Sequence, residues 1–454
     1  MLTSINPINE EILKKYGEHT QDEIDKILHH SQNAFSEWRQ TGFSHRAKLM
    51  KRAAEVLREH PEEYANLMAN EMGKPLAGGR SEIEKCAWTC DYYADYAEQF
   101  LQDELIESDA SKSFVTYQPL GVVLAIMPWN FPFWQVFRFA APSLMAGNTG
   151  VLKHASNVTG CALAIEDVFR QAGFPDYLFR TLKIGSSRVD EVIEHPIVQA
   201  VTLTGSVPAG RAVAKKAGSM LKKTVLELGG SDPYLILEDA DLEMATYTCV
   251  NSRLINSGQS CIAAKRFIVV ESVKEKFEQF FVQNMKKKKM GDPLDEQNDI
   301  GPQARNDLRD ELHQQVAESI KKGAQCLLGG EKLKKKGAWY PPTVLTNVQP
   351  GMPAYDEELF GPVASIIIAK DEQDAIRIAN DSQFGLGSAV FTNDVNKGER
   401  IAVKELQAGS CFVNSLVKSD PRLPFGGIKD SGYGRELSYF GIKEFVNIKT
   451  VCVG

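Results

Sequence analysis

The sequence has no long apolar segment and no excess of basic residues. No run of about 18 apolar residues occurs in the chain, and the opening MLTSINPINEEILKKYGEHT lacks an apolar core followed by a small-residue cleavage site. The formal net charge of -7 gives no reason to expect a surface for nucleic acid or for an anionic membrane. We therefore expect a soluble, cytoplasmic protein whose partners are small molecules and other copies of itself.

The cysteine and histidine patterns of metal sites and disulfide frameworks are also missing. The eight cysteines are scattered without a CxxC pair, and the eight histidines form no HxxxH or HExxH cluster. This argues against the usual zinc sites and indicates reduced thiols. We expect no metal site, so any chemistry must depend on other side chains.

The chain contains no G-x-G-x-x-G sequence, which argues against a conventional Rossmann dinucleotide site. Another candidate phosphate site lies in AVTLTGSVPAGRAVAKKAG (200–218), where the pattern predicts a strand, a Thr-Gly-Ser turn and a helix. The N–H groups that begin this helix and the Ser206 hydroxyl would lie where a pyrophosphate binds.

Hydrophobic periodicity predicts helices first, and then strands alternating with helices. Between residues 22 and 100 apolar residues recur at three and four positions, as in SHRAKLMKRAAEVLREHPEEYANLMANEMG. From residue 113 short β-rich runs such as GVVLAIMP and TVLELGG alternate with helical segments, and a second series follows residue 230. The alternation predicts an α/β fold with parallel sheets, in two closely packed domains with a cleft between them.

Three polar residues at predicted turns or strand ends are candidates for catalysis. Cys261 lies in NSGQSC, a turn suited to a nearby ligand, although a free cysteine is more often a buried small hydrophobe. Glu227 ends the run TVLE, where a strand delivers a carboxylate either to the ligand-binding edge of a sheet or to solvent. Asn130 follows GVVLAIMPW. Its side-chain amide either donates a hydrogen bond to an oxyanion or only stabilises the turn.

These segments resemble the aldehyde dehydrogenase superfamily, in matches spread over the whole chain. The family's three short signatures are present as PWN at 128–130, LELGG at 226–230 and NxGQxC at 256–261. The resemblance implies NAD(P)-dependent oxidation of an aldehyde to a carboxylic acid, with Cys261 as the nucleophile. It also implies that Asn130 and the Cys261 N–H hold the oxyanion, and that Glu227 is the general base for thioester hydrolysis. The implied fold has two Rossmann-like α/β domains and a small β oligomerisation element.

The resemblance also implies which residues contact NADP or NAD. Many NAD-preferring relatives have a glutamate three residues after the Lys153 position, where this chain has Ser156. An acid there would repel a 2′-phosphate and serine would not, so we expect NADP to be accepted, and a preference for it over NAD is the further prediction. The expected cofactor contacts are Trp129, Lys153, Ser156, Thr204, Gly205, Ser206, Leu228, Glu358 and Phe360.

Within the superfamily the chain is most similar to the shorter bacterial succinate-semialdehyde dehydrogenases, in segments such as PWNFPFWQVFR and KSDPRLPFGG. Arg138 stands where those enzymes have an arginine that binds the substrate carboxylate, and a structural ion pair is the alternative role. A second arginine of some relatives is replaced by Ile255, so Lys418, Ser419 or Arg422 would supply the other contact. We expect oxidation of succinate semialdehyde, with glutarate semialdehyde or a simple aldehyde as alternatives.

Two further functions remain open for this fold. A CoA-acylating dehydrogenase would pass the thioester to CoA instead of water, but a hydrolytic base at Glu227 argues against it. A catalytically silent binding protein would be expected to have lost one of the three catalytic candidates, and all three are present.

The resemblance implies a division of the chain into three parts. The cofactor-binding domain would comprise residues 1–100 and 120–227, and the catalytic domain residues 228–430. Residues 101–119 and 431–454 would form a hairpin and arm that add a strand to a neighbouring subunit. We expect a homodimer or a homotetramer.

Overall fold

The N-terminal part of the chain consists of a hairpin and four helices. The computed structural model describes residues 1–454 and begins with β1 (Leu2–Ile5) and β2 (Ile12–Tyr16). The helices that follow are α1 (Gln21–Trp38), α2 (Phe43–Glu59), α3 (Pro61–Met72) and α4 (Leu76–Phe100). Thr20 and Glu23 form a capping box that fixes the start of α1. The helical pattern of residues 22–100 is therefore confirmed.

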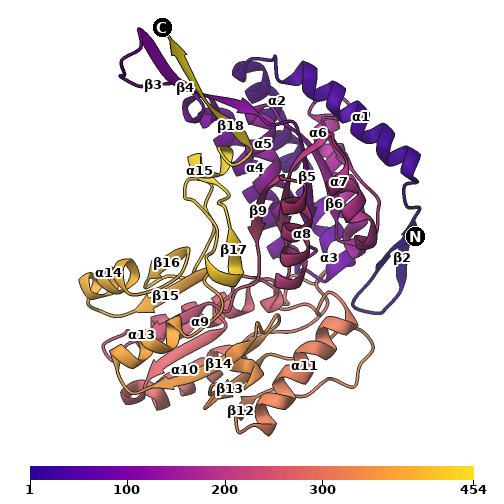
Figure 1. Ribbon diagram of the computed structural model, residues 1–454. Helices are drawn as coiled ribbons and strands as arrows, with labels where there is room; N and C mark the ends of the chain where they lie inside the picture. The colour runs from indigo at the N-terminus through magenta and orange to yellow at the C-terminus, as the bar shows by residue number, and fades with distance from the viewer.

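The first large sheet has six strands in the order β17-β9-β8-β5-β6-β7 (Figure 1). They are β5 (Val122–Met127), β6 (Thr149–His154), β7 (Phe179–Thr181), β8 (Val198–Thr204), β9 (Lys223–Glu227) and β17 (Gly432–Tyr433). All are parallel except β17, which pairs antiparallel with β9. The intervening helices are α5 (Trp134–Ala146), α6 (Thr159–Gln171), α7 (Val189–Glu194) and α8 (Val207–Ser219). The central strand β5 is almost wholly buried, as in a parallel sheet covered on both faces.

The second large sheet has seven strands in the order β12-β13-β14-β11-β10-β15-β16. They are β10 (Pro233–Ile236), β11 (Arg266–Val270), β12 (Gln325–Leu328), β13 (Thr343–Thr346), β14 (Val363–Ala369), β15 (Gly387–Phe391) and β16 (Ser410–Val413). Only β12 is antiparallel to its neighbour. The helices are α9 (Leu242–Leu254), α10 (Lys274–Lys286), α11 (Asn306–Lys321), α12 (Pro353–Asp356), α13 (Glu372–Asn380) and α14 (Val395–Lys404). Two largely parallel sheets confirm the predicted α/β class.

A third, smaller sheet projects from the body at the upper left of Figure 1. It consists of β18 (Val446–Val453), β4 (Lys112–Pro119) and β3 (Glu104–Leu105), all antiparallel. The C-terminal segment differs in part from the expected arm at 431–454, because β17 joins the first large sheet and α15 (Ser438–Ile442) packs against α4 and α5. Only β18 of that segment belongs to the projecting sheet.

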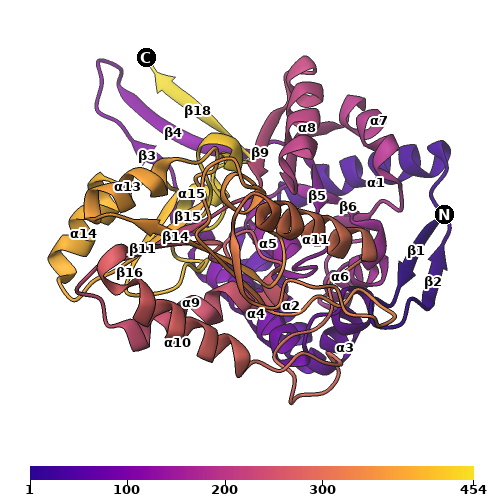
Figure 2. The same ribbon diagram turned by 90° about the horizontal axis from the view of Figure 1, so that it is seen from below.

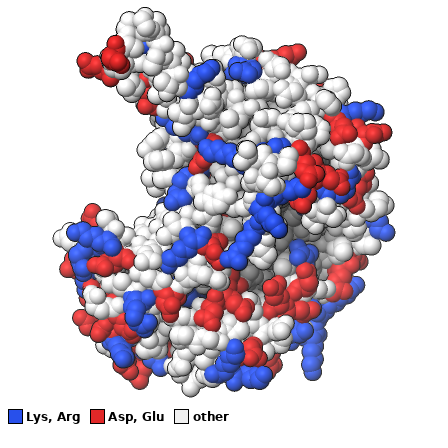
Figure 3. Space-filling view, in the orientation of Figure 1, with Lys and Arg blue, Asp and Glu red and all other residues white.

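Two surface properties bear on the expected partners. On the face shown in Figure 3 basic and acidic side chains are interspersed, and the surface is hollowed between the upper and lower parts of the molecule. None of the helices is both long and apolar enough to span a bilayer.

The first sheet directs its carboxyl ends toward the unit formed by the second sheet (Figures 1 and 2). The loop after β5 carries Trp129 and Asn130, the loop after β8 carries Ser206, and β9 ends at Glu227. Because ligands bind at the carboxyl edge of parallel sheets, this edge is where the fold places a site.

Candidate active site

Cys261 lies between two cavities that meet at its side chain. The first has a volume of about 510 Å³ and lies between the loops at the carboxyl edge of the first sheet and residues of the second unit such as Phe360. The second, of about 450 Å³, is lined by residues of α4, α5 and the segment before Cys261. Cys261 and Gln135 are the two residues that line both cavities. Two reactants, one in each cavity, would therefore meet at the thiol.

A strained turn presents the thiol to these cavities. Three consecutive residues before it adopt left-handed backbone: Asn256 (φ 53°), Ser257 (φ 57°) and Gly258 (φ 78°). Each of the two non-glycine residues costs on the order of 1 kcal/mol or more. The buried Arg253 side chain holds the turn by donating to the Gly258 carbonyl oxygen at 2.6 Å. A Cβ at position 258 would lie 2.2 Å from the Gly361 carbonyl oxygen, so only glycine fits there.

The surroundings of Cys261 favour the neutral thiol. Burial raises its pKa to about 12, and the nearby cations Arg138 and Lys265 offset this only in part. Lys265 lies close because its Nζ donates to the Cys261 carbonyl oxygen at 2.7 Å. The neutral thiol predominates because the effect of burial outweighs that of the two positive charges. The nucleophile must lose its proton to a base before it reacts.

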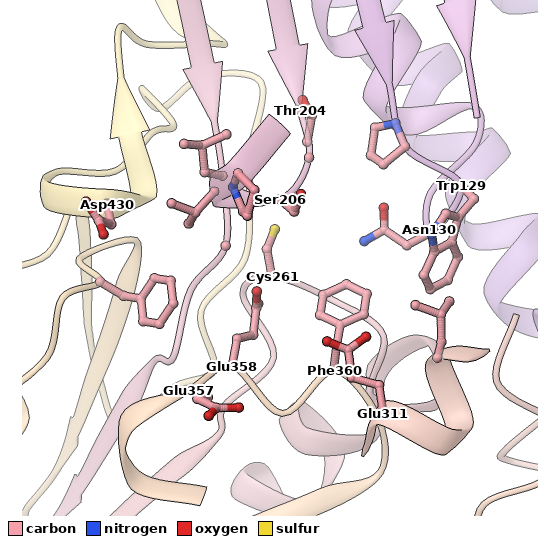
Figure 4. Close-up of a pocket in the computed structure, with 18 of the residues that line it drawn as sticks. Trp129, Asn130, Thr204, Ser206, Cys261, Glu311, Glu357, Glu358, Phe360 and Asp430 are labelled. Atoms are coloured by element: carbon pink, nitrogen blue, oxygen red, sulfur yellow. The ribbon is translucent and has the colours of Figure 1, made fainter. Parts of the chain in front are cut away.

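Asn130 lies in the turn after β5, with its amide nitrogen on the side that faces Cys261 (Figure 4). Its Nδ2 donates to the Gln259 carbonyl oxygen at 3.1 Å, and its own carbonyl oxygen accepts from Asn256 Nδ2 at 2.6 Å. An amide nitrogen carries two hydrogens, so one remains available to an oxyanion. The geometry fits the predicted oxyanion donor, held in place by the turn of the nucleophile.

Glu227 ends β9 as predicted, but its side chain lines neither cavity. The carboxyl group is buried beside Gly426, and neither of its oxygens accepts a hydrogen bond. Burial and the neighbouring Glu436 carboxylate hold the pKa of Glu227 well above its usual range. The structure therefore brings this carboxyl near the site without directing it at the thiol, and in this position burial favours its protonated form.

Seven of the nine residues predicted to contact the cofactor line the first cavity: Trp129, Thr204, Gly205, Ser206, Leu228, Glu358 and Phe360. Ser206 is the N-cap of α8, yet its side chain makes no capping hydrogen bond. The Ser206 hydroxyl and the N–H groups of the first helical turn are therefore free, which suits a phosphate. Glu358 lies below Cys261 in Figure 4 and forms an ion pair with Lys265 at 3.2 Å.

The other two predicted cofactor residues, Lys153 and Ser156, do not line this cavity. Both lie at the carboxyl edge of the first sheet. Lys153 is near the end of β6, and Ser156 begins the short 3-10 helix that follows. Lys153 is buried and forms no ion pair, and burial lowers its pKa. A buried cation without a protein anion, next to an uncharged serine, fits a ribose bearing a phosphate.

Both predicted substrate residues, Arg138 and Ser419, line the second cavity. Arg138 is also ion-paired through Nε with the buried Glu436, and its Nη2 donates to Thr204 Oγ1 at 3.4 Å. Arg138 therefore also forms the structural ion pair that was its alternative role. Its Nη1 donates to no protein group. Ile255 lines the same cavity and leaves it without a second arginine on that side.

Of the alternatives predicted for the second contact, Lys418 also lines this cavity and Arg422 does not, but the motifs did not predict a further cation there. Lys85 of α4 lines it and donates from Nζ to Ser419 Oγ at 2.7 Å. One signal was available: Glu82 and Lys85 interrupt the otherwise apolar stripe of α4, which buries Ile83, Cys86 and Cys90.

Comparisons with known proteins identify the family of the chain. The sequence model of the Aldehyde dehydrogenase family matches residues 1–451. The chain is 49% identical to a probable succinate-semialdehyde dehydrogenase [NADP(+)] of Synechocystis sp. over 452 residues, covering 100% of this chain and 99% of that protein. It is 48% identical to the Escherichia coli succinate semialdehyde dehydrogenase [NAD(P)+] Sad, covering 99% and 97%. A crystal structure of succinic semialdehyde dehydrogenase from Streptococcus pyogenes in complex with NADP+ superimposes with a TM-score of 0.97 at 35% identity, covering all of both chains.

Proposed function

The chain belongs to the aldehyde dehydrogenase family, and from this premise we propose that it oxidises succinate semialdehyde to succinate with NADP as the hydride acceptor. The observation that carries the proposal is the second cavity, which opens onto Cys261 and contains Arg138 and Ser419. A guanidinium and a hydroxyl suit an aldehyde that bears a carboxylate at its far end. The relatives at 48–49% identity are named for this activity.

The catalytic residues divide the reaction between them. After losing its proton, the Cys261 sulfur forms a bond to the aldehyde carbon, and Asn130 Nδ2–H and the Cys261 N–H donate to the oxyanion. Hydride then leaves the former aldehyde carbon as the C=O bond re-forms, and the nicotinamide, when bound, would supply the hydride acceptor. The thioester that remains on Cys261 is attacked by water, whose proton passes to Glu227 once that side chain has turned toward the site and ionised. The C–S bond then breaks and releases the acid.

We expect Ser156→Glu to shift the cofactor preference from NADP toward NAD. A carboxylate beside Lys153 would repel the 2′-phosphate, so kcat/KM for NADP should fall roughly 10- to 100-fold while that for NAD changes much less. The measurement is initial-rate kinetics with both cofactors, and Ser156→Gln is the uncharged control of similar size. The cofactor assignment would be wrong if the unmodified enzyme had a kcat/KM for NADP far below that for NAD.

Arg138→Ala should lower kcat/KM for succinate semialdehyde about 100-fold, and far more than for the uncharged aldehyde hexanal. The reason is that a charged hydrogen bond to the carboxylate is lost. Rates of NADPH formation with the two aldehydes check this.

The matched control addresses the ion pair of Arg138. Removing Arg138 alone leaves Glu436 buried without a partner, and such a change destabilises a protein by about 3–5 kcal/mol. The double variant Arg138→Met/Glu436→Gln removes both charges and should show the same loss of discrimination. Equal losses on both aldehydes would contradict carboxylate binding by Arg138.

A substrate panel tests the reaction itself. NADPH formation should be fastest with succinate semialdehyde, slower with glutarate semialdehyde and slowest with hexanal, and should not require CoA. Absolute dependence on CoA would favour the acylating alternative, and absence of turnover with every aldehyde would favour a silent binding protein.

We further propose that the first large sheet belongs to the cofactor-binding domain, the second to the catalytic domain and the projecting sheet β18-β4-β3 to an oligomerisation element, and that the chain forms a homodimer or a homotetramer. In support, the projecting sheet ends in β18, most of whose side chains are exposed. A second subunit would cover such an edge by adding a strand. Light scattering of the purified protein measures the state, and a monomer at micromolar concentration would contradict it.

A further inference from the structure

Lys85 carries a charge that no protein carboxylate neutralises. Its Nζ lies 4.3 Å from the centre of the Trp134 ring and 2.7 Å from Ser419 Oγ, and it forms no ion pair. Burial and the neighbouring Arg138 lower the pKa of Lys85 to about 8. A cation in such a place is costly unless an anion joins it.

The two carboxylates whose charges act on Lys85 are engaged elsewhere. Glu82, on the same helix, forms a buried ion pair with Lys74 and accepts from the N–H groups of Phe133 and Trp134 at 2.8 and 2.9 Å. Asp420 binds the Arg422 side chain through both of its oxygens, at 2.9 and 2.7 Å. Neither acid is free to pair with Lys85, so its counter-charge must come from outside the chain.

Three unused donors lie around the same cavity. Ser419 Oγ accepts from Lys85, so the Ser419 hydroxyl hydrogen is free to donate. Arg138 Nη1 and the remaining hydrogens of Lys85 Nζ also lack acceptors. All three residues line the cavity that opens onto Cys261. The two oxygens of one carboxylate have enough lone pairs for these donors.

We propose that Lys85 binds the carboxylate of the aldehyde substrate and, with Ser419 and Arg138, selects aldehydes that end in an acid. The inference rests on the proposed function and deepens it. Lys85 supplies the second positive charge that is missing because Ile255 replaces the second arginine of some relatives. An uncharged aldehyde in the cavity would leave Lys85 unpaired, so the same lysine disfavours such substrates.

Two substitutions at Lys85 test the inference. Lys85→Met keeps the length of the side chain without its charge, and Lys85→Arg restores a cation. For Lys85→Met we expect kcat/KM for succinate semialdehyde to fall about 10- to 100-fold, mainly through KM, and the value for hexanal to fall far less. Lys85→Arg should recover most of the loss. Lys51→Met is the matched control, because Lys51 pairs with Asp95 of α4 at 2.6 Å and lines neither cavity.

Inhibition by succinate tests carboxylate binding by Lys85 separately from the proposed substrate. Succinate should inhibit hexanal oxidation competitively with the aldehyde, and Lys85→Met should raise its Ki by the same factor as it lowers kcat/KM. If the unmodified enzyme does not prefer succinate semialdehyde to hexanal, the proposed substrate is wrong, and the succinate Ki still reports whether Lys85 binds a carboxylate. An unchanged Ki, with equal losses on both aldehydes, would overturn the inference and leave Lys85 a structural partner of Trp134. If Lys85→Met does not fold, Lys85→Gln replaces it in the same assays.

The pH dependence of that Ki is a readout that a structural role would not affect. The titratable or charged groups around Lys85 are Glu82 and Cys86 of α4, Arg138 of α5, and Lys418 and Asp420 of the segment before β17. Lys85 is charged below a pH of about 8, so the Ki should be constant there and should rise as the pH increases and the lysine loses its proton. In Lys85→Met this rise should disappear; a rise of the same size in the variant would contradict the proposal.

Discussion

Replacing Cys261 with alanine is expected to reduce NADPH formation on the order of 10⁴-fold or more with every aldehyde. The thiol is the one nucleophile at the point where the two cavities meet, so no neighbouring group can form the thioester in its place. Steady-state rates with succinate semialdehyde and hexanal measure the loss. Titration with NADP should show nearly unchanged binding, since the cofactor contacts lie on other residues.

Alkylation with iodoacetamide provides the control for this prediction. Because burial raises the pKa of Cys261 to about 12, the rate of inactivation should increase about tenfold per pH unit between pH 7 and 9. Cys326→Ala, at an exposed cysteine outside both cavities, should leave activity and inactivation unchanged. Residual turnover above about 1% in Cys261→Ala would mean that the nucleophile lies elsewhere.

Short motifs predicted the parts of the site that belong to turns at strand ends. Asn130 and Ser206 follow β5 and β8, and parallel strands bring such turns to one edge whatever the remaining sequence. The turn before Cys261 was predictable for a similar reason, because its glycine and small polar residues permit left-handed backbone. Local sequence was therefore sufficient to indicate which loops form the site.

Contacts between distant segments were not predictable in this way. Lys85 reaches the second cavity only because α4 packs against α5, and Arg138 meets Glu436 only because the C-terminal segment returns to the first sheet. Strands β7 and β17 have three and two residues, too few for a periodic pattern. In each case tertiary packing determines the contact, and it lies beyond the range of local periodicity.

The orientation of the Glu227 side chain was not predicted from the sequence either. The proposed role of Glu227 as the general base leads to the second prediction with a large expected effect on the rate. Glu227→Gln should lower the steady-state rate about 10²- to 10⁴-fold, because glutamine cannot accept the proton of the attacking water. Formation of the thioester should be affected less than its hydrolysis. Rapid mixing should therefore show a burst of NADPH close to one equivalent of active sites, followed by slow turnover.

The pH profile distinguishes a base from a merely structural carboxyl. Burial and Glu436 hold the pKa of Glu227 well above its usual range, so the fraction of ionised base grows as the pH increases, and kcat should rise with it. Glu227→Gln, which is nearly isosteric, should flatten this rise. Absence of the burst, with the first turnover slowed as much as the later ones, would instead place Glu227 before hydride transfer, as the base that takes the proton of Cys261. In both cases the side chain must leave its buried position beside Gly426, since there it reaches neither the thiol nor a water at the thioester.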